Sequence, residues 1–281
     1  LDNNEVKLPD VEFNVYDEAN QIVDTLVTDE NGEAISKRLP IDQEYKVQET
    51  KTGEWYVLNE EPQTAILEQD QITELTFENE KKKGQVRVIK VDLDDNEVLL
   101  EGVTFEILDE DENVVDTVVT DKNGEATTKR LPIDQQYTVV EKETRKEYVL
   151  TEETQTVELK QDEITSITFE NEKIKGYVEV TKVDSETKET LEGAEFGIYN
   201  ENDELIGTIK TDKTGKAKSE LIPYGKYYLK ELDTGSVYYL LNENTYNFEI
   251  VNNHETVPVT IENDGVDIEV TVEKQGTTEI K

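Results

Sequence analysis

The sequence predicts an all-β protein built from three tandem immunoglobulin-like β-sandwich domains. Its apolar residues alternate with polar ones in short runs bounded by turn residues, which is the pattern of strands with one buried face. About seven such runs fall in each stretch of roughly 90 residues, as in immunoglobulin-like sandwiches. Helical periodicity is absent, so we expect sheets alone.

The composition argues against several classes of function. The 281 residues include 67 acidic and 29 basic side chains, which give a net charge of −38. Such a charge argues against binding to nucleic acid or to an anionic membrane surface. Low hydrophobicity with high charge is also typical of disorder, but the alternating runs indicate folded domains with thin cores. The chain has no cysteine, and no apolar run approaches the roughly 18 residues of a membrane-spanning helix.

Internal repeats define the domain organisation. The segment Val27–Tyr45 recurs 92 residues later (119 − 27) as Val119–Tyr137. A more divergent third copy contains the matching segments Thr211–Ala217 and Ile222–Glu231. The joints between copies are too short to act as flexible tethers, so we expect three domains in a rod. Their expected boundaries are 1–83, 84–175 and 176–264, followed by one further strand within 265–281.

Within the second copy the alternation predicts seven strands. They are expected at Val86–Val91, Val103–Leu108, Val114–Thr120, Gly124–Thr128, Tyr137–Lys142, Gln155–Lys160 and Ile164–Asn171. The pair Asn123-Gly124, like Asn31-Gly32 in the first copy, is a good signal for a tight turn, because both residue types tolerate positive φ.

The first of these strands carries an unexpected lysine. The stretch VRVIKVD at Val86–Asp92 returns as VEVTKVD at Val178–Asp184. Successive side chains of a strand point to opposite faces, so Lys90 and Lys182 share a face with the valines that precede them. If those valines face a core, the two ammonium groups do so as well. A lone buried lysine is costly, so each lysine is expected to meet polar partners there.

The same alternation places a glutamate and an asparagine on the inward faces of two other strands. The glutamates are Glu49, Glu141 and Glu231, and the asparagines that end the last strand of each copy are Asn79, Asn171 and Asn263. The second and third copies therefore each point a lysine, a glutamate and an asparagine inward from three strands. From the residues alone, such a cluster is either a buried ion pair with an asparagine partner or a site of covalent chemistry.

The motifs, taken in order, resemble a known family. They are KVD, the TDxxG hairpin, the Leu-Pro or Ile-Pro stretch that leads to Tyr and Glu, and the terminal FEN or IEN. This combination is similar to the Cna B-type (SpaA-like, prealbumin-like) repeat domains of Gram-positive surface proteins and pilins. In that family the lysine of the first strand and the asparagine of the last join spontaneously in an isopeptide bond. The resemblance implies Lys90–Asn171 and Lys182–Asn263 bonds, promoted by Glu141 and Glu231.

General chemistry agrees with what the resemblance implies. Burial lowers the pKa of a lysine and raises that of a glutamate. A neutral amine can then attack the asparagine carbonyl carbon, while a protonated glutamate polarises the carbonyl and relays protons as ammonia leaves. Each domain would react once on itself, so the protein is not expected to be an enzyme. We expect neither a cofactor nor a metal ion.

The resemblance also implies an extracellular location, at the cell surface or in the cell wall of a Gram-positive bacterium. We expect a structural stalk or fibre segment of an adhesin or pilus, whose partners are other domains of the same protein or fibre. Two alternatives stay open. One is an adhesin region that recognises host matrix or glycan, and the other is a subunit of a strand-exchanged head-to-tail fibre.

The first copy has no counterpart of the lysine strand, because the offset of 92 aligns Leu1 with Leu93. Glu49 and Asn79 therefore lack a lysine in their own copy. The segment Ile268–Lys274 alternates again, with Lys274 on the apolar face, and predicts one more strand. Two explanations are open: the sequence is a piece of a longer repeat protein, or this strand completes the first copy of the next molecule. In the second case Lys274 could join Asn79.

Overall fold

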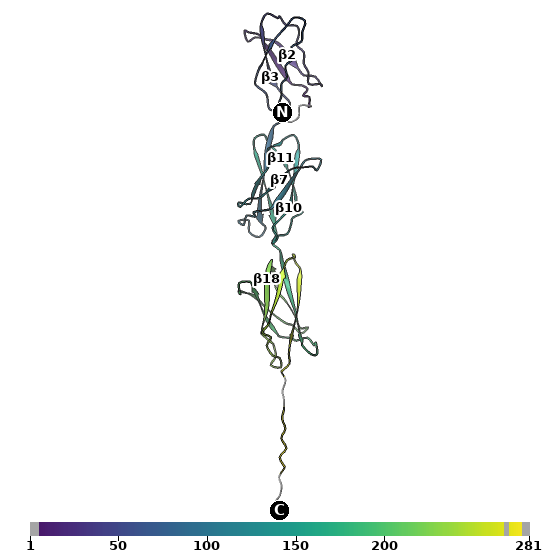
Figure 1. The fold of residues 1–281 in the computed structure, drawn as a ribbon, viewed down its shortest axis with the longest axis vertical. Helices are drawn as coiled ribbons and strands as arrows, with labels where there is room; N and C mark the ends of the chain where they lie inside the picture. Colours follow the sequence, from purple (N-terminus) through teal and green to yellow (C-terminus); the bar gives the residue numbers. More distant parts are fainter. Residues whose placement is uncertain (1–5, 267–269, 277–281) are drawn as a thin grey trace, which may run out of the picture. The chain divides into compact units, whose positions relative to one another are not determined.

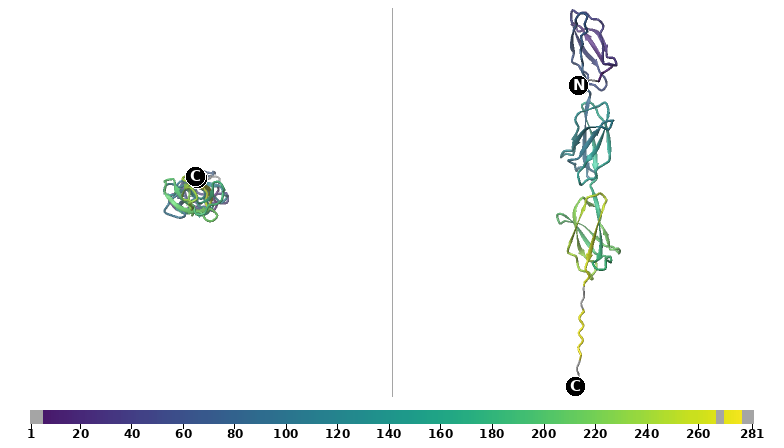
Figure 2. Two further views of the ribbon diagram at one scale, coloured as in Figure 1. Left: turned by 90° about the horizontal axis from the view of Figure 1, so that it is seen from below. Right: turned by 45° about the vertical axis from the view of Figure 1, so that its right-hand side comes forward.

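The predicted all-β fold is confirmed by a computed structural model, which describes residues 6–266 and 270–276. Throughout those ranges the chain forms strands, turns and loops and no helix (Figures 1 and 2). The strands group into five sheets. One sheet belongs to the first copy, and two belong to each of the others (Figure 1).

The second copy is a sandwich of two four-stranded sheets. Its strands are β5 (Lys83–Asp92), β6 (Thr104–Leu108), β7 (Val114–Val119), β8 (Glu125–Thr127), β9 (Leu131–Pro132), β10 (Gln136–Glu143), β11 (Thr154–Glu158) and β12 (Ile164–Asn171). One sheet has the order β11-β10-β6-β7, and the other has the order β12-β5-β8 with β9 also paired to β5. The seven predicted strands are all present, and the short β9 is an addition that the alternation did not reveal.

The third copy repeats this architecture. Its strands are β13 (Lys175–Asp184), β14 (Glu195–Asn200), β15 (Leu205–Lys210), β16 (Lys216–Lys218), β17 (Ile222–Pro223), β18 (Gly225–Asp233), β19 (Thr245–Ile250) and β20 (Thr256–Asn263). Strands β15-β14-β18-β19 form one antiparallel sheet. In the other sheet, β13 lies between β20 and β16. The pairing of β13 with β20, the first and last strands of this copy, is parallel.

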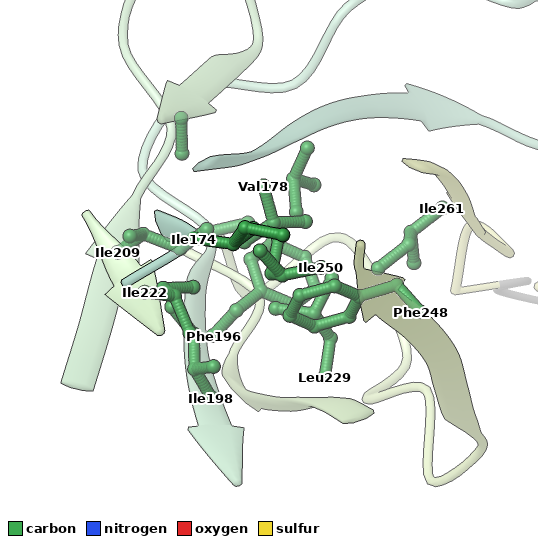
Figure 3. Packing of buried hydrophobic residues seen from close by; sticks show 13 residues of the cluster. Ile174, Val178, Phe196, Ile198, Ile209, Ile222, Leu229, Phe248, Ile250 and Ile261 are labelled. Carbon is green, nitrogen blue, oxygen red and sulfur yellow. The ribbon is translucent and has the colours of Figure 1, made fainter. Parts of the chain in front are cut away.

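The core of the third copy lies between these two sheets. Figure 3 shows Val178 of β13 and Ile261 of β20 beside Phe196, Leu229 and Phe248, which come from the opposite sheet. All five are buried. Because alternate residues of each strand face inward, a chain with few apolar residues still builds a continuous core. Full burial of one such side chain contributes about 1.5–3 kcal/mol.

The first copy contains a single sheet among its described residues. Its strands are β1 (Glu12–Tyr16), β2 (Ile22–Val27), β3 (Glu44–Lys51) and β4 (Gln63–Ile66), in the order β2-β1-β3-β4. The segments aligned with β8 and β12, at 33–35 and 72–79, are not assigned to strands. In the other copies such strands pair with β5 or β13, and the described part of the first copy has no equivalent of either.

The strand predicted at Ile268–Lys274 is absent from the part of this segment that the structure describes. Residues 270–276 form no strand, and Val270 and Val272 are 79% and 84% exposed. A strand is stabilised by hydrogen bonds to a neighbour, and this segment pairs with none of the described strands. Residues 267–269, which include Ile268, lie outside the described part of the chain.

Candidate functional site

In the third copy, the three predicted side chains meet in the core. Lys182 of β13, Glu231 of β18 and Asn263 at the end of β20 are each at most 2% exposed. The Lys182 Nζ lies 3.6 Å from Glu231 Oε1 and donates a hydrogen bond to Asn263 Oδ1. Asn263 Nδ2 donates to the two carboxylate oxygens of Glu231 at 3.1 and 2.9 Å. Each member of the cluster therefore contacts the other two.

Strand pairing brings these residues together. In the parallel β13–β20 pair, Lys182 lies opposite Ile261 and Asp184 lies opposite Asn263. Asn263 therefore ends its strand two residues beyond the partner of the lysine, on the same face of the sheet. Glu231 reaches the cluster from the opposite sheet, where it pairs with Phe196 beside an irregularity in the β14–β18 register.

Burial in the core favours the neutral form of Lys182. Burial lowers the pKa of Lys182 to about 8, although the nearby Glu231 carboxylate opposes the shift. With a pKa near 8, about a tenth of the amine is neutral at pH 7, against well under a thousandth for a free lysine. A neutral amine has the lone pair that a nucleophile needs.

The geometry suits transfer of the asparagine acyl group to the lysine. Lys182 Nζ lies against the side-chain oxygen of Asn263, so the carbonyl carbon is the adjacent electrophile. Glu231 contacts both the attacking nitrogen and Nδ2, the nitrogen that would leave. One carboxyl group can therefore accept a proton from the amine and deliver one to the departing ammonia. The bond between Lys182 Nζ and Asn263 Cγ would form and the bond between Asn263 Cγ and Nδ2 would break, and this exchange requires no cofactor.

The second copy has the same residue types in the corresponding strands. Lys90 and Glu141 form a fully buried ion pair, with 3.9 Å between Nζ and Oε2. Lys90 Nζ also donates to the carbonyl oxygens of Val91 and Phe169, each at 3.2 Å. Asn171 is 1% exposed and ends β12, which is the neighbour of β5 in the sheet. Its Nδ2 donates to Thr144 Oγ1 at 2.7 Å, whereas its counterpart in the third copy donates to the glutamate.

The first copy brings together only the acid and the amide. Asn79 Nδ2 donates to Glu49 Oε1 at 2.8 Å, and Glu49 is 2% exposed. Burial raises the pKa of this carboxyl, against the hydrogen bonds from Asn79 and the Asn59 backbone. Lys274, the lysine proposed from the sequence as a partner for Asn79, is exposed in the described C-terminal segment.

Sequence reasoning missed an aspartate two residues beyond each lysine. Asp92 is fully buried and accepts hydrogen bonds from the Tyr148 hydroxyl and Lys173 Nζ, each at 2.8 Å. Burial alone would raise its pKa, but these bonds and that from the Asp94 amide lower it to about 2. In the third copy the pKa of Asp184 is lowered mainly by hydrogen bonds from the backbone amides of Thr187 and Glu186, and a hydrogen bond from Tyr239 adds to this. The repeated KVD motif could have predicted this buried aspartate, because the aspartate lies two residues beyond the lysine and so on the same face of the strand.

Fold and site together define a class of protein: tandem β-sandwiches whose first and last strands meet at a buried lysine, glutamate and asparagine. A model of the SpaA prealbumin-like fold domain matches residues 1–81, 84–173 and 176–265. The chain belongs to this family.

The chain is similar to several known proteins. The Bacillus anthracis TIE protein is 32% identical in sequence with a TM-score of 0.75, and the match covers 92% of this chain and 48% of that one. The trypsin-resistant surface T6 protein of Streptococcus pyogenes serotype M6 is 47% identical over 51 residues, which are 18% of this chain and 10% of that protein. BcpA, the major pilin subunit of Bacillus cereus, is 19% identical with a TM-score of 0.40, over 94% and 97% of the two chains. This chain thus spans about half of the first protein and a tenth of the second.

The described residues include no helix long and apolar enough to cross a membrane.

Proposed function

We propose that the chain is a structural segment of a Gram-positive surface adhesin or pilus, strengthened by Lys–Asn isopeptide bonds in its second and third copies. The observation that carries the proposal is the buried Lys182–Glu231–Asn263 cluster, which places an amine against an amide carbonyl with a shared carboxyl group. The equivalent bond in the second copy joins Lys90 to Asn171 with Glu141 as the promoting acid.

The position of the bond suits a segment that carries tension. It joins the first strand of a copy to its last, and these are the strands through which force enters and leaves when the chain is pulled at both ends. In the third copy the lysine and asparagine are 81 residues apart in sequence. A covalent link between them lets the load pass along β13 to Lys182 and across the bond to Asn263, so that the residues between them are not unfolded.

Stretching a single molecule tests this role. Pulled between its two ends, the chain is expected to extend without release of the segment enclosed by Lys182 and Asn263, which are 81 residues apart in sequence. In Glu231→Gln, where the bond does not form, unfolding of the third copy should release up to about 270–290 Å of additional contour length. The surface variant Glu249→Gln is the matched control. The first copy, which has no lysine strand among its described residues, can unfold in either protein, so a second release of this length by the unmodified protein would contradict the proposed function.

A further inference from the structure

A threonine contacts the candidate reactive asparagine of the second copy. Thr144 Oγ1 accepts a hydrogen bond from Asn171 Nδ2 at 2.7 Å. Asn171 is 1% exposed, and Thr144 is partly buried. In the proposed reaction Nδ2 is the nitrogen that leaves as ammonia. The Thr144 hydroxyl therefore touches one of the reacting atoms.

A β-bulge accounts for the position of Thr144. This residue lies three beyond Glu141, and residues three apart in a regular strand point to opposite faces. In the pairing of β10 with β6, Glu141 lies opposite Phe105. The residue before Phe105, however, lies opposite Glu143, so residue 142 is an extra one. Such a bulge bends the strand and re-aims the side chains that follow, which lets Thr144 share the face of Glu141.

The other copies repeat both the bulge and the threonine. The register shifts directly after Glu49 in the β1–β3 pair, and directly after Glu231 in the β14–β18 pair. Thr52 and Thr234 follow these glutamates by three residues. Thr52 Oγ1 is buried, and it has no hydrogen-bond partner among the residues that the structure describes. Each copy therefore places a threonine hydroxyl just beyond its bulge.

The third copy uses its threonine differently and so provides a comparison within the chain. Thr234 Oγ1 donates a hydrogen bond to the carbonyl oxygen of Ser236 at 2.6 Å. The leaving nitrogen, Asn263 Nδ2, is held by the two carboxylate oxygens of Glu231. The hydroxyl is thus bound to the asparagine in the second copy and to its own turn in the third.

A hydrogen bond at Nδ2 determines which way an asparagine carbonyl faces. The last side-chain torsion of asparagine is broad, so the strand alone does not fix the plane of the amide group. A nucleophile approaches the carbonyl carbon from above this plane, and the reaction is fast when the folded protein already holds that geometry. Because the amide group is planar, holding Asn171 Nδ2 also orients the carbonyl carbon.

We propose that Thr144 is a further catalytic residue of the second copy, whose hydroxyl holds Asn171 Nδ2 so that the carbonyl carbon faces Lys90. The role of Thr144 rests on the proposed function, because it concerns the same isopeptide bond. The bond between Lys90 Nζ and Asn171 Cγ forms, and the bond between Asn171 Cγ and Nδ2 breaks. Glu141 takes a proton from the amine and passes one to the leaving nitrogen, so one ammonia departs and Thr144 is unchanged.

The rate at which each bond forms tests this role within one molecule. The full 281-residue chain is made in a brief cell-free synthesis and denatured at intervals after synthesis stops. After digestion, mass spectrometry quantifies the peptides that join Lys90 to Asn171 and Lys182 to Asn263. In Thr144→Val, which keeps the side-chain shape without the hydroxyl, the Lys90–Asn171 bond should form at least about fivefold more slowly. The Lys182–Asn263 bond of the same molecules should keep its rate.

Two further variants and a pH series separate orientation of the amide from other effects. Thr144→Ser retains a hydroxyl and should restore the rate of the second-copy bond. Thr234→Val is the matched control in the third copy, and should leave the rates of both bonds unchanged. Thr144 carries no charge, so Thr144→Val should slow the reaction by the same factor at every pH from about 6 to about 9. A displaced pH profile would show that Thr144 acts through the ionisation of Lys90, and would overturn the proposal.

An unchanged rate of the Lys90–Asn171 bond in Thr144→Val would overturn the role of Thr144 and leave the proposed function intact. If the unmodified chain forms no such bond, both are wrong. Glu141→Gln, in which the bond is not expected, provides the test for a folding defect. If adding Thr144→Val to Glu141→Gln unfolds the second copy at the temperature of the reaction, the slower reaction reflects lost structure, and the proposed role of Thr144 is wrong.

Discussion

Replacing Glu231 by glutamine should lower the free energy of unfolding of the third copy by about 4–5 kcal/mol. In the proposed reaction Glu231 moves protons between Lys182 and Asn263, so the isopeptide bond is not expected to form in the variant. Treated like a disulfide, a cross-link that closes 81 residues restricts the unfolded chain by about that much. The third copy should then melt at a temperature lower by more than about 15 °C in calorimetry.

A loss of similar size could come from breaking an ion pair that was never cross-linked, since removal of one buried partner costs about 3–5 kcal/mol. The double variant Lys182→Met with Glu231→Gln separates the two explanations. It removes the ammonium and the carboxylate together, which is often neutral or stabilising for a simple ion pair. If the bond exists, the double variant should remain as destabilised as Glu231→Gln. Recovery of the original stability would contradict the cross-link, and the exposed Glu249→Gln should change little.

Replacing Asp92 by asparagine should destabilise the second copy by about 2 kcal/mol at pH 7. The folded state holds the Asp92 pKa near 2, from an ordinary value of 3.8, through hydrogen bonds from Lys173 and Tyr148. A lowered folded pKa gives stability that is complete above the unfolded pKa and lost as the pH falls through the folded one. The difference between the protein and the variant should therefore shrink as the pH falls from about 4 to about 2.

Chemical denaturation at several pH values measures this effect. The exposed Asp111→Asn is the matched control, for which we expect a difference within about 0.5 kcal/mol at every pH. A gap between Asp92→Asn and the unmodified protein that stays constant from pH 7 to pH 2 would show that the charge of Asp92 does not act in this way.

The fold could be predicted from the sequence because its strongest signal is local. Alternation in Val86–Val91 predicts which side chains face inward, and the pattern of burial along β5 agrees with it as far as Lys90, after which Val91 is buried as well. Because the sequence repeats, a strand predicted in one copy is also expected at the matching position of the next. The short strand β9 has only two residues, too few for alternation to show, and its pairing with β5 depends on tertiary structure.

The candidate site was predicted in part for the same reason. Lys182, Glu231 and Asn263 could be placed on the inward faces of their strands because alternate residues of a strand share a face. Their mutual contacts, however, depend on the parallel register of β13 and β20. The Asp92–Tyr148 pair spans 56 residues of sequence, and no local pattern shows which tyrosine reaches which aspartate. The strand expected at 268–274 was predicted from alternation alone, which says nothing about whether a partner strand is present.

The intact mass of the denatured protein tests the central chemical claim most directly. Each isopeptide bond removes one ammonia, so the chain should weigh two ammonia molecules less than its sequence. After correction for the substitutions, Glu231→Gln should show a deficit of one, and Glu141→Gln with Glu231→Gln a deficit of none. A mass equal to that of the unmodified sequence would contradict the account and leave Lys90 and Lys182 as buried ion pairs.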